Sequence, residues 1–169
     1  MIKKWLFIIL GGISIGVFAQ EPEQRLEQNP QVDMVIITPD MFELINEVNT
    51  DPERSAFFKG LTYFAMFSAT DRQAAGDIYR QALDYAAQKG MKLLLKVKDT
   101  DKDTYFYYIP ADQKGYAREI VLLIFYPGQD KARLWHIKGH INLKKISLLA
   151  LQRTQIDTSV LKEAEKKVE

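Results

Sequence analysis

The sequence predicts an α+β domain with a largely antiparallel mixed sheet of about six strands and helices packed on one face. Three observations lead to this class. Apolar residues recur with helical spacing in the N-terminal half, the period changes to two after Gly90, and short polar turns separate the later strands. Because sequential strands joined by short turns usually pair antiparallel, we expect the order β-α-β-α-β-β-β-β-α.

Residues 1–19 have the pattern of a secretory signal peptide. Two lysines precede an uncharged apolar stretch, and Ala19 supplies the small residue of an A-x-A-like cleavage site before Gln20. The alternative is an uncleaved anchor, but the apolar stretch is shorter than the roughly 20 residues that a spanning helix needs. We expect cleavage near Ala19/Gln20 and a periplasmic or secreted protein, with no stable membrane insertion after cleavage.

The composition of the remaining chain suits one domain. Removing 19 of the 169 residues leaves 150, enough to bury a sizeable core. Two of the 23 basic residues lie in the leader, so 21 basic residues stand against 22 acidic ones, and no nucleic-acid partner is expected. The chain has no cysteine, which excludes both a disulfide and a thiol for lipid attachment.

The first elements follow from composition and capping residues. Residues 20–31 hold two prolines and a single large apolar residue, so we expect a flexible lead-in. Residues 32–37 are rich in β-branched side chains and predict a strand, and Thr38-Pro39 predicts the start of a helix. The stripe expected to face the core from that helix is Met41, Leu44, Ile45 and Val48.

A second strand and a long helix are expected next. Asp51-Pro52 predicts a short helical turn through Phe58, and the apolar run 61–68 predicts the strand. Thr70 to Gln73 has the T-x-x-Q pattern of a capping box, and Gly90 is suited to close the helix that follows. The side chains expected to point inward from it are Ala75, Ile78, Tyr79, Ala82, Leu83 and Ala86.

Four strands in meander complete the predicted sheet. They are residues 91–97, 105–109, 119–126 and 132–143. Leu143, Ile146, Leu149 and Ala150 have the spacing of a final core helix. The expected organisation is a single α+β domain over residues 32–151, followed by a charged C-terminal helix or tail over 152–169.

Three segments of the C-terminal half form a distinctive pattern: Met91–Val97, Arg118-Glu119 before an aliphatic strand, and Lys138–Leu143 before the last helix. In these segments the chain resembles an exported bacterial family common in Bacteroidetes, number 4252 in the series of domains of unknown function. The resemblance covers roughly residues 32–151. It implies a cell-envelope location and a single small α+β domain, with no assigned chemistry.

Two patterns resemble metal sites only superficially. His136 and His140 stand four apart, but in a strand they would be roughly 13 Å apart, too far to share an ion, and they are expected on a solvated face. Asp99, Asp101 and Asp103 resemble the start of a calcium loop, whose sixth and twelfth positions should be glycine and glutamate. This chain has Thr104 and Pro110 there. We expect no metal and no cofactor.

Glu119 is the weak candidate for a catalytic residue. It lies just before the most apolar strand, so a buried carboxyl group with a raised pKa could act as a general acid. The alternative is a structural ion pair with Arg118. The patterns of a nucleophile elbow, a helical zinc pair and a phosphate-binding glycine loop are missing, which favours a protein without catalytic activity.

The predicted binding residues are Tyr105, Tyr107, Tyr108 and Gly139. Tyrosines on both faces of one strand predict that some are exposed as a contact patch, although half-covered rings suit any strand. The function expected is therefore an exported cell-envelope domain that binds an envelope protein or peptide. The alternatives are a carrier whose pocket for a small apolar ligand lies near Gly139, under the helix of residues 71–89, and, last, an envelope hydrolase.

Overall fold

The computed structural model describes residues 21–48, 55 and 58–146 of the chain. Within these residues six strands form one antiparallel sheet in the order β1-β2-β6-β5-β4-β3. The elements are α1 (Pro22–Leu26), β1 (Asp33–Ile37), α2 (Pro39–Val48), β2 (Leu61–Ala69), α4 (Arg72–Gln88), β3 (Lys92–Lys98), β4 (Asp103–Pro110), β5 (Tyr116–Tyr126) and β6 (Lys131–Asn142). The predicted α+β class is confirmed.

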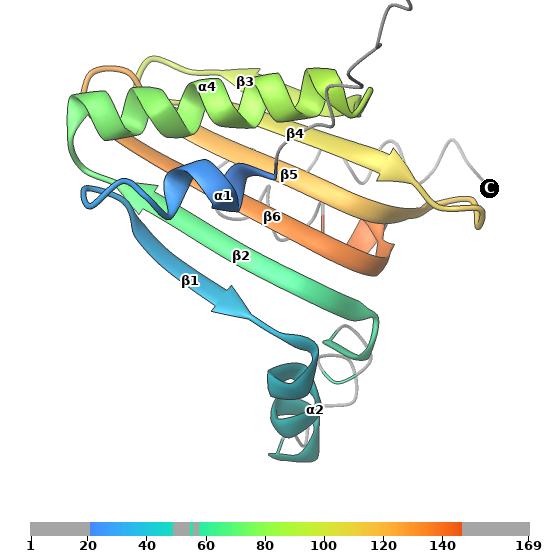
Figure 1. Ribbon diagram of the computed structural model, residues 1–169. Helices are drawn as coiled ribbons and strands as arrows, with labels where there is room; N and C mark the ends of the chain where they lie inside the picture. Colours follow the sequence, from blue (N-terminus) through green and yellow to red (C-terminus); the bar gives the residue numbers. More distant parts are fainter. Residues whose placement is uncertain (1–20, 49–54, 56–57, 147–169) are drawn as a thin grey trace, which may run out of the picture.

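Helices α4 and α1 lie side by side across one face of the sheet (Figure 1). The core beneath them is made by small and aromatic side chains of α4 against alternate residues of the strands. Its most buried members include Leu26, Phe67, Ile78, Tyr85, Tyr105, Leu123 and Leu134. A second buried cluster lies on the opposite face and includes Phe42, Phe106, Ile120, Leu122, Ile137 and Ile141.

Helix α4 begins one residue later than the sequence pattern suggests. The side chain of Asp71, not of Thr70, accepts hydrogen bonds from the backbone N–H groups of Gln73 (2.9 Å) and Ala74 (3.0 Å). At the other end Gly90 has a φ of 60°, and the N–H of Met91 bonds the carbonyl of Ala86 at 2.9 Å. This is the Schellman ending that the glycine predicted.

The segment expected to be a flexible lead-in contains a helix. Residues 22–26 form α1, with proline at its start, and Leu26 is buried in the core under α4. The single large apolar residue of this segment is enough to hold the helix because the side chain of Glu23 beside it bonds Tyr63 and His136 of the sheet. The expectation of a flexible lead-in is wrong for these residues.

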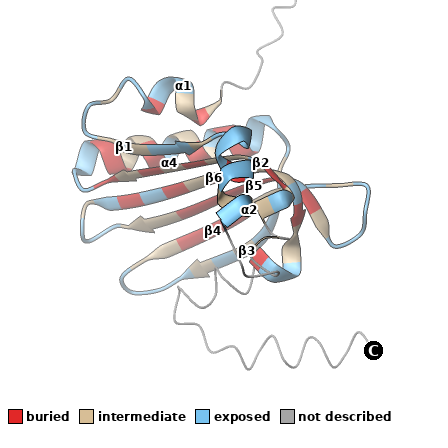
Figure 2. Cartoon of the chain, turned by 90° about the horizontal axis from the view of Figure 1, so that it is seen from below, coloured by how far each residue is buried: buried red, intermediate tan, exposed pale blue. Residues whose placement is uncertain are grey.

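Of the apolar stripe expected on α2, only Ile45 packs against the core, where it contacts the second cluster. Met41, Leu44 and Val48 are 49%, 57% and 81% exposed, whereas Phe42 is buried against Phe58. Figure 2 shows most of α2 in the colour of exposed residues. The helix packs on the end of β2 instead of lying along the sheet, so only a narrow part of its surface is covered.

Several predicted segments lie outside the described residues. These are the leader over 1–19, most of the short turn of residues 51–58, the end of the last helix beyond residue 146, and the tail over 152–169. Residues 143–146 are helical, as predicted for the start of that helix. Among the residues that the structure describes, no helix combines the length and apolar character needed to cross a bilayer.

Candidate functional site: a buried glutamate–histidine network

His136 on β6 is fully buried between the sheet and the two helices that cover it. Its Nδ1 lies 2.7 Å from Oε1 of Glu23 on α1, and its Nε2 lies 2.8 Å from Oε1 of Glu119 on β5. Burial by itself lowers the pKa of His136, but hydrogen bonds and charge from Glu119 and Glu23 outweigh it and raise the pKa above its ordinary value. Since carboxylates only accept, two hydrogen bonds from this ring to Glu23 and Glu119 require a proton on each ring nitrogen.

Two tyrosines complete the bonding of these carboxylates. The hydroxyl of Tyr63 donates to Oε1 of Glu23 at 2.7 Å, and the hydroxyl of Tyr85 donates to Oε1 of Glu119. Both rings stand edge-on to His136, with centroid distances of 5.6 and 5.2 Å. Burial, followed by the adjoining carboxylates, raises the pKa of both phenols, so they remain protonated donors.

Glu21 links the network to two lysines at its rim. Its Oε2 accepts a hydrogen bond from Nζ of Lys138 at 2.8 Å and lies 3.1 Å from the hydroxyl of Tyr85. Nζ of Lys89 lies 3.6 Å from its Oε1. We call this set the glutamate–histidine network; its members are Glu21, Glu23, Tyr63, Tyr85, Lys89, Glu119, His136 and Lys138. Three carboxylates and three cations balance its charge.

The structure corrects the chemistry expected of Glu119. Burial raises its pKa, but hydrogen bonds from His136 and Tyr85 outweigh burial, and the pKa lies below its ordinary value. The same balance, with His136 and Tyr63 as donors, lowers the pKa of Glu23. This direction is opposite to the raised pKa expected for a general acid at Glu119. Its partners are His136 and Tyr85, not the neighbouring Arg118.

A β-bulge aims Glu119 at His136. The register between β5 and β6 shifts between Ala117 and Glu119, which leaves Arg118 exposed and turns Glu119 toward α4. A second shift, between Leu61 and Tyr63 on β2, turns Tyr63 to the same face. Both irregularities therefore serve to place network residues on the side of the sheet that α1 and α4 cover.

The expectation of a solvated face for His136 is wrong. Helices α4 and α1 cover the face of β6 that carries His136. Glu23 of α1 and Tyr85 of α4 both contact the imidazole ring. His140, in contrast, is exposed and stacks on Tyr116 with a centroid distance of 4.2 Å. The two histidines therefore occupy unlike surroundings and share no partner.

One atom from each of Glu21, Glu23 and His136 could in principle meet at a metal ion, since these atoms lie within 4.8 Å of one another. In this site, His136 and Lys138 already supply positive charge to the carboxylates. The Nδ1 proton of His136 bonds Glu23, and the ammonium group of Lys138 bonds Glu21. An ion would have to displace both, so we interpret the cluster as an internal ionic network.

The predicted binding residues do not form one exposed patch. Tyr105 is buried under α4, with its hydroxyl 3.3 Å from that of Tyr79. Tyr107 is half-buried beside it, and Tyr108 packs in the cluster on the opposite face. Gly139 leaves no room for a ligand, because a side chain there would collide with the carbonyl oxygen of Gly60, whose backbone fills the space.

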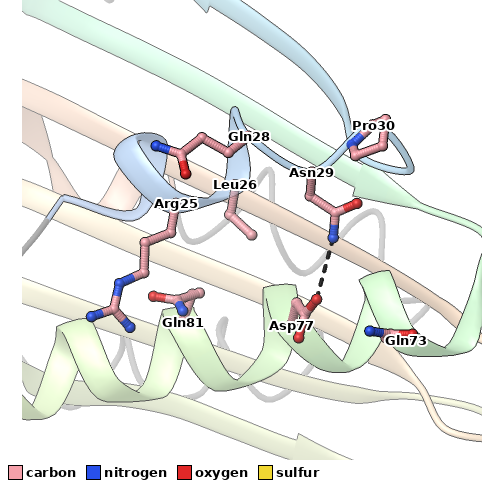
Figure 3. Close-up of a pocket in the computed structure, with 8 residues that line it drawn as sticks. All are labelled: Arg25, Leu26, Gln28, Asn29, Pro30, Gln73, Asp77 and Gln81. Carbon is pink, nitrogen blue, oxygen red and sulfur yellow. Dashed lines mark hydrogen bonds between the residues drawn. The ribbon is translucent and has the colours of Figure 1, made fainter.

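An open hollow of about 440 Å³ lies between α1 and α4, away from all four of these residues. Figure 3 shows amide and charged side chains around it, with Asn29 donating a hydrogen bond to Asp77 at 3.2 Å. Its lining residues are Arg25, Leu26, Gln28, Asn29, Pro30, Gln73, Asp77 and Gln81. The hollow is polar and shallow, so it does not match the apolar ligand pocket expected under this helix.

Sequence reasoning missed Glu21, Glu23, Tyr63 and Tyr85 as members of the site. The signal for them is weak: Glu21-Pro22 resembles a helix start, and Tyr85 is a large polar-tipped residue among the inward alanines of α4. The partners of His136 lie 113 and 17 residues away along the chain. Only the folded sheet reveals that they meet.

The fold and the network together define a class of protein: a small α+β domain with an open antiparallel sheet, whose N-terminal helix is joined to the sheet by a buried ionic network. The model of the family described as "Domain of unknown function (DUF4252)" matches residues 26–149, and the chain belongs to this family. No curated protein and no solved structure matches the chain.

Proposed function

We propose that this protein is an exported cell-envelope domain that binds other protein chains and carries out no chemistry of its own. One observation carries the proposal. Among the described residues, the exposed large apolar side chains all lie on the two edge strands and on α2; they are Val35, Ile36, Met41, Leu44, Val48, Leu93 and Leu94. Apolar residues gathered at open sheet edges are typical of interaction sites.

The state of the glutamate–histidine network favours binding over catalysis. Each carboxylate accepts from groups inside the network, the imidazole is buried, and Glu23 and Glu119 are held deprotonated. Hydrolysis with a glutamic acid as the general acid needs a carboxyl group that still holds its proton beside the substrate. The network is better suited to fastening α1 to the sheet.

Export is supported by the leader pattern, and the described helix nearest to the expected cleavage site lies beyond that site. α1 begins at Pro22, two residues after the expected new N-terminus at Gln20. The test is the intact mass of the protein recovered from its own envelope fraction. A mass that begins at Gln20 supports export with cleavage, and a mass that includes Met1 contradicts it.

The binding proposal is tested by photo-crosslinking in the native cell envelope. A photoreactive residue at Leu44 on α2 or at Leu93 on β3 should give discrete crosslinked bands, because Leu44 is exposed on the helix next to the β1 edge in sequence and Leu93 is exposed on the β3 edge. The matched control is the same residue at Asp112, which is exposed in the loop between β4 and β5. Equal crosslinking at the control, or none at either edge, contradicts the proposal.

A further inference from the structure

The elements at the two ends of the strand order differ in charge: β1 contains one acid, Asp33, the helix α2 that follows it contains three more, and β3 contains only lysines as charged residues. Residues 33–48, which span β1 and α2, contain four acidic side chains and no basic one: Asp33, Asp40, Glu43 and Glu47. β3, at the other edge, contains three lysines and no acid: Lys92, Lys96 and Lys98. Lys98 lies 4.0 Å from Asp103 of the same chain, yet 68% of its side chain is exposed. We call these the acidic edge and the basic edge.

Both edge strands also expose apolar side chains and carry an outer row of backbone hydrogen-bonding groups. Val35 and Ile36 on β1 are 47% and 41% exposed, and Leu93 and Leu94 on β3 are 50% and 40% exposed. β1 and β3 are the two ends of the strand order, and within the described ranges no strand pairs with the outer side of either. Each edge therefore presents backbone N–H and C=O groups to which another strand can bond.

We propose that copies of this chain join edge to edge, with β1 of one copy beside β3 of the next. The inference rests on the proposed binding function and names the partner as a second copy. Charge complementarity selects this pairing. Two acidic edges or two basic edges would repel each other, because like charges facing each other across neighbouring strands are unfavourable, whereas the acidic edge attracts the basic edge.

This pairing joins unlike surfaces, so it does not stop at a dimer. Every added copy leaves one acidic and one basic edge free, and the assembly grows into a ring if its rotation closes or into an open filament if it does not. The contact is limited by the five residues of β1, against seven in β3. Small interfaces of this kind are weak and dissociate readily, so association should depend on concentration.

The first experiment is sedimentation velocity on the protein purified from the envelope fraction. We expect the mean sedimentation coefficient to rise between about 10 μM and about 1 mM protein. Raising the salt from about 0.05 M to about 0.5 M should lower it again, because salt screens charge pairs at an exposed edge. A single species of monomer mass across this range overturns the inference.

Charge reversal tests which surfaces meet. Reversing the basic edge (Lys92→Glu, Lys96→Glu, Lys98→Glu) or the acidic edge (Asp33→Lys, Asp40→Lys, Glu43→Lys, Glu47→Lys) should abolish self-association. An equimolar mixture of the two variants should regain it, since each then offers the edge that the other lacks. The control reverses Lys114, Lys131 and Lys145, which are exposed away from β3, and should associate like the parent.

A disulfide test serves in case the reversed variants fold poorly. The chain contains no cysteine, so Val35→Cys and Leu94→Cys each introduce the sole thiol. On mixing and mild oxidation, the disulfide between the two variants should form in at least tenfold excess over either self-disulfide. The proportions of random pairing, in which the mixed disulfide is about twice as abundant as either self-disulfide, overturn the inference.

The outcomes separate this inference from the proposed function. Edge crosslinks to other proteins, with a monomer in sedimentation, overturn self-assembly and leave the binding function standing. Absence of crosslinks at both edges overturns both. Association that survives either charge reversal overturns the edge pairing alone, because the copies then meet through another surface.

Discussion

His136 is the residue on which the buried network depends, because each ring nitrogen bonds a carboxylate from a different element. Removing one partner of a buried ionic pair leaves an uncompensated charge, which is more costly than never having had the pair. The stabilising role of His136 thus lies in satisfying Glu23 and Glu119 together. A neutral amide at this position cannot do so.

We therefore expect His136→Gln to lower the free energy of unfolding at neutral pH by about 3–5 kcal/mol. The measurement is urea unfolding followed by circular dichroism. His140→Gln is the control and should change stability by less than about 0.5 kcal/mol, because His140 is exposed. Equal effects of the two substitutions would contradict the role assigned to His136.

The pH range of this stabilisation is limited by His136 at its upper end and by Glu23 and Glu119 at its lower end. The pKa of His136 is raised above 6.5 on folding, so its contribution is complete below pH 6.5 and is lost as pH rises through the raised value. The pKa values of Glu23 and Glu119 are lowered below 4.5, so their contribution is complete above pH 4.5 and is lost as pH falls through the lowered values. The network should stabilise most between pH 4.5 and 6.5.

The check is the difference in unfolding free energy between the parent and His136→Gln, measured from about pH 3 to about pH 9. Subtracting the variant removes titrations that the two proteins share. The difference should reach its maximum in the stated interval and decline on both sides. A difference that is constant with pH would show that His136 acts by packing alone.

Among the elements, helix α4 owes its start to Asp71. We expect Asp71→Ala to cost about 1 kcal/mol, because two backbone N–H groups lose their acceptor. Thr70→Ala is the matched neighbour and should cost less, since the cap bonds come from Asp71. Thermal unfolding of both variants measures the two losses of stability. A larger loss of stability for Thr70→Ala would support the capping box at Thr70 that the sequence pattern indicated.

The junction of β2 and β6 requires a glycine at position 139. Its φ of 143° is unfavourable for other residues, and a Cβ there would collide with the backbone of Gly60, whose oxygen accepts from the N–H of His140 at 2.6 Å. We expect Gly139→Ala to destabilise by more than about 2 kcal/mol. Gly128→Ala, in an open turn, is the control; a similar loss in both would refute the close approach.

The elements can be predicted from the sequence better than the site. Strand and helix positions follow from local period and turn residues, which is why the predicted ranges of β3 to β6 and α4 agree with the structure within a few residues. The local pattern does not predict α1 or the exposure of the apolar stripe of α2, because tertiary contacts determine both. It fails most for the network, since Glu23 and His136 meet only through the completed sheet.

At the scale of the whole molecule, the sheet is protected at its centre and open at both ends. β6 and β5 lie between other strands and carry buried residues on both faces, whereas β1 and β3 have one neighbouring strand each within residues 21–48 and 58–146. Hydrogen exchange should therefore be slowest in β5 and β6 and fastest in the edge strands of the dilute protein.

Exchange also gives a separate view of assembly. If copies join through their edges, amides of β1 and β3 should gain protection as protein concentration rises, while those of β5 and β6 should keep the same rates. Mass spectrometry of peptic peptides at two concentrations makes the comparison. Protection that is confined to other segments would place the contact elsewhere.

The position of β6 sets the order in which the molecule can be built. It is the last strand of the described sheet along the chain, yet it lies between β2 and β5 and carries His136, to which α1 is joined. When the chain emerges N-terminus first, the β1-β2 pair cannot join the β3-β5 meander before β6 is available. β6 ends at Asn142. This strand order suits the proposed export, because a chain that is translocated unfolded must not complete its sheet before its last strand has been delivered.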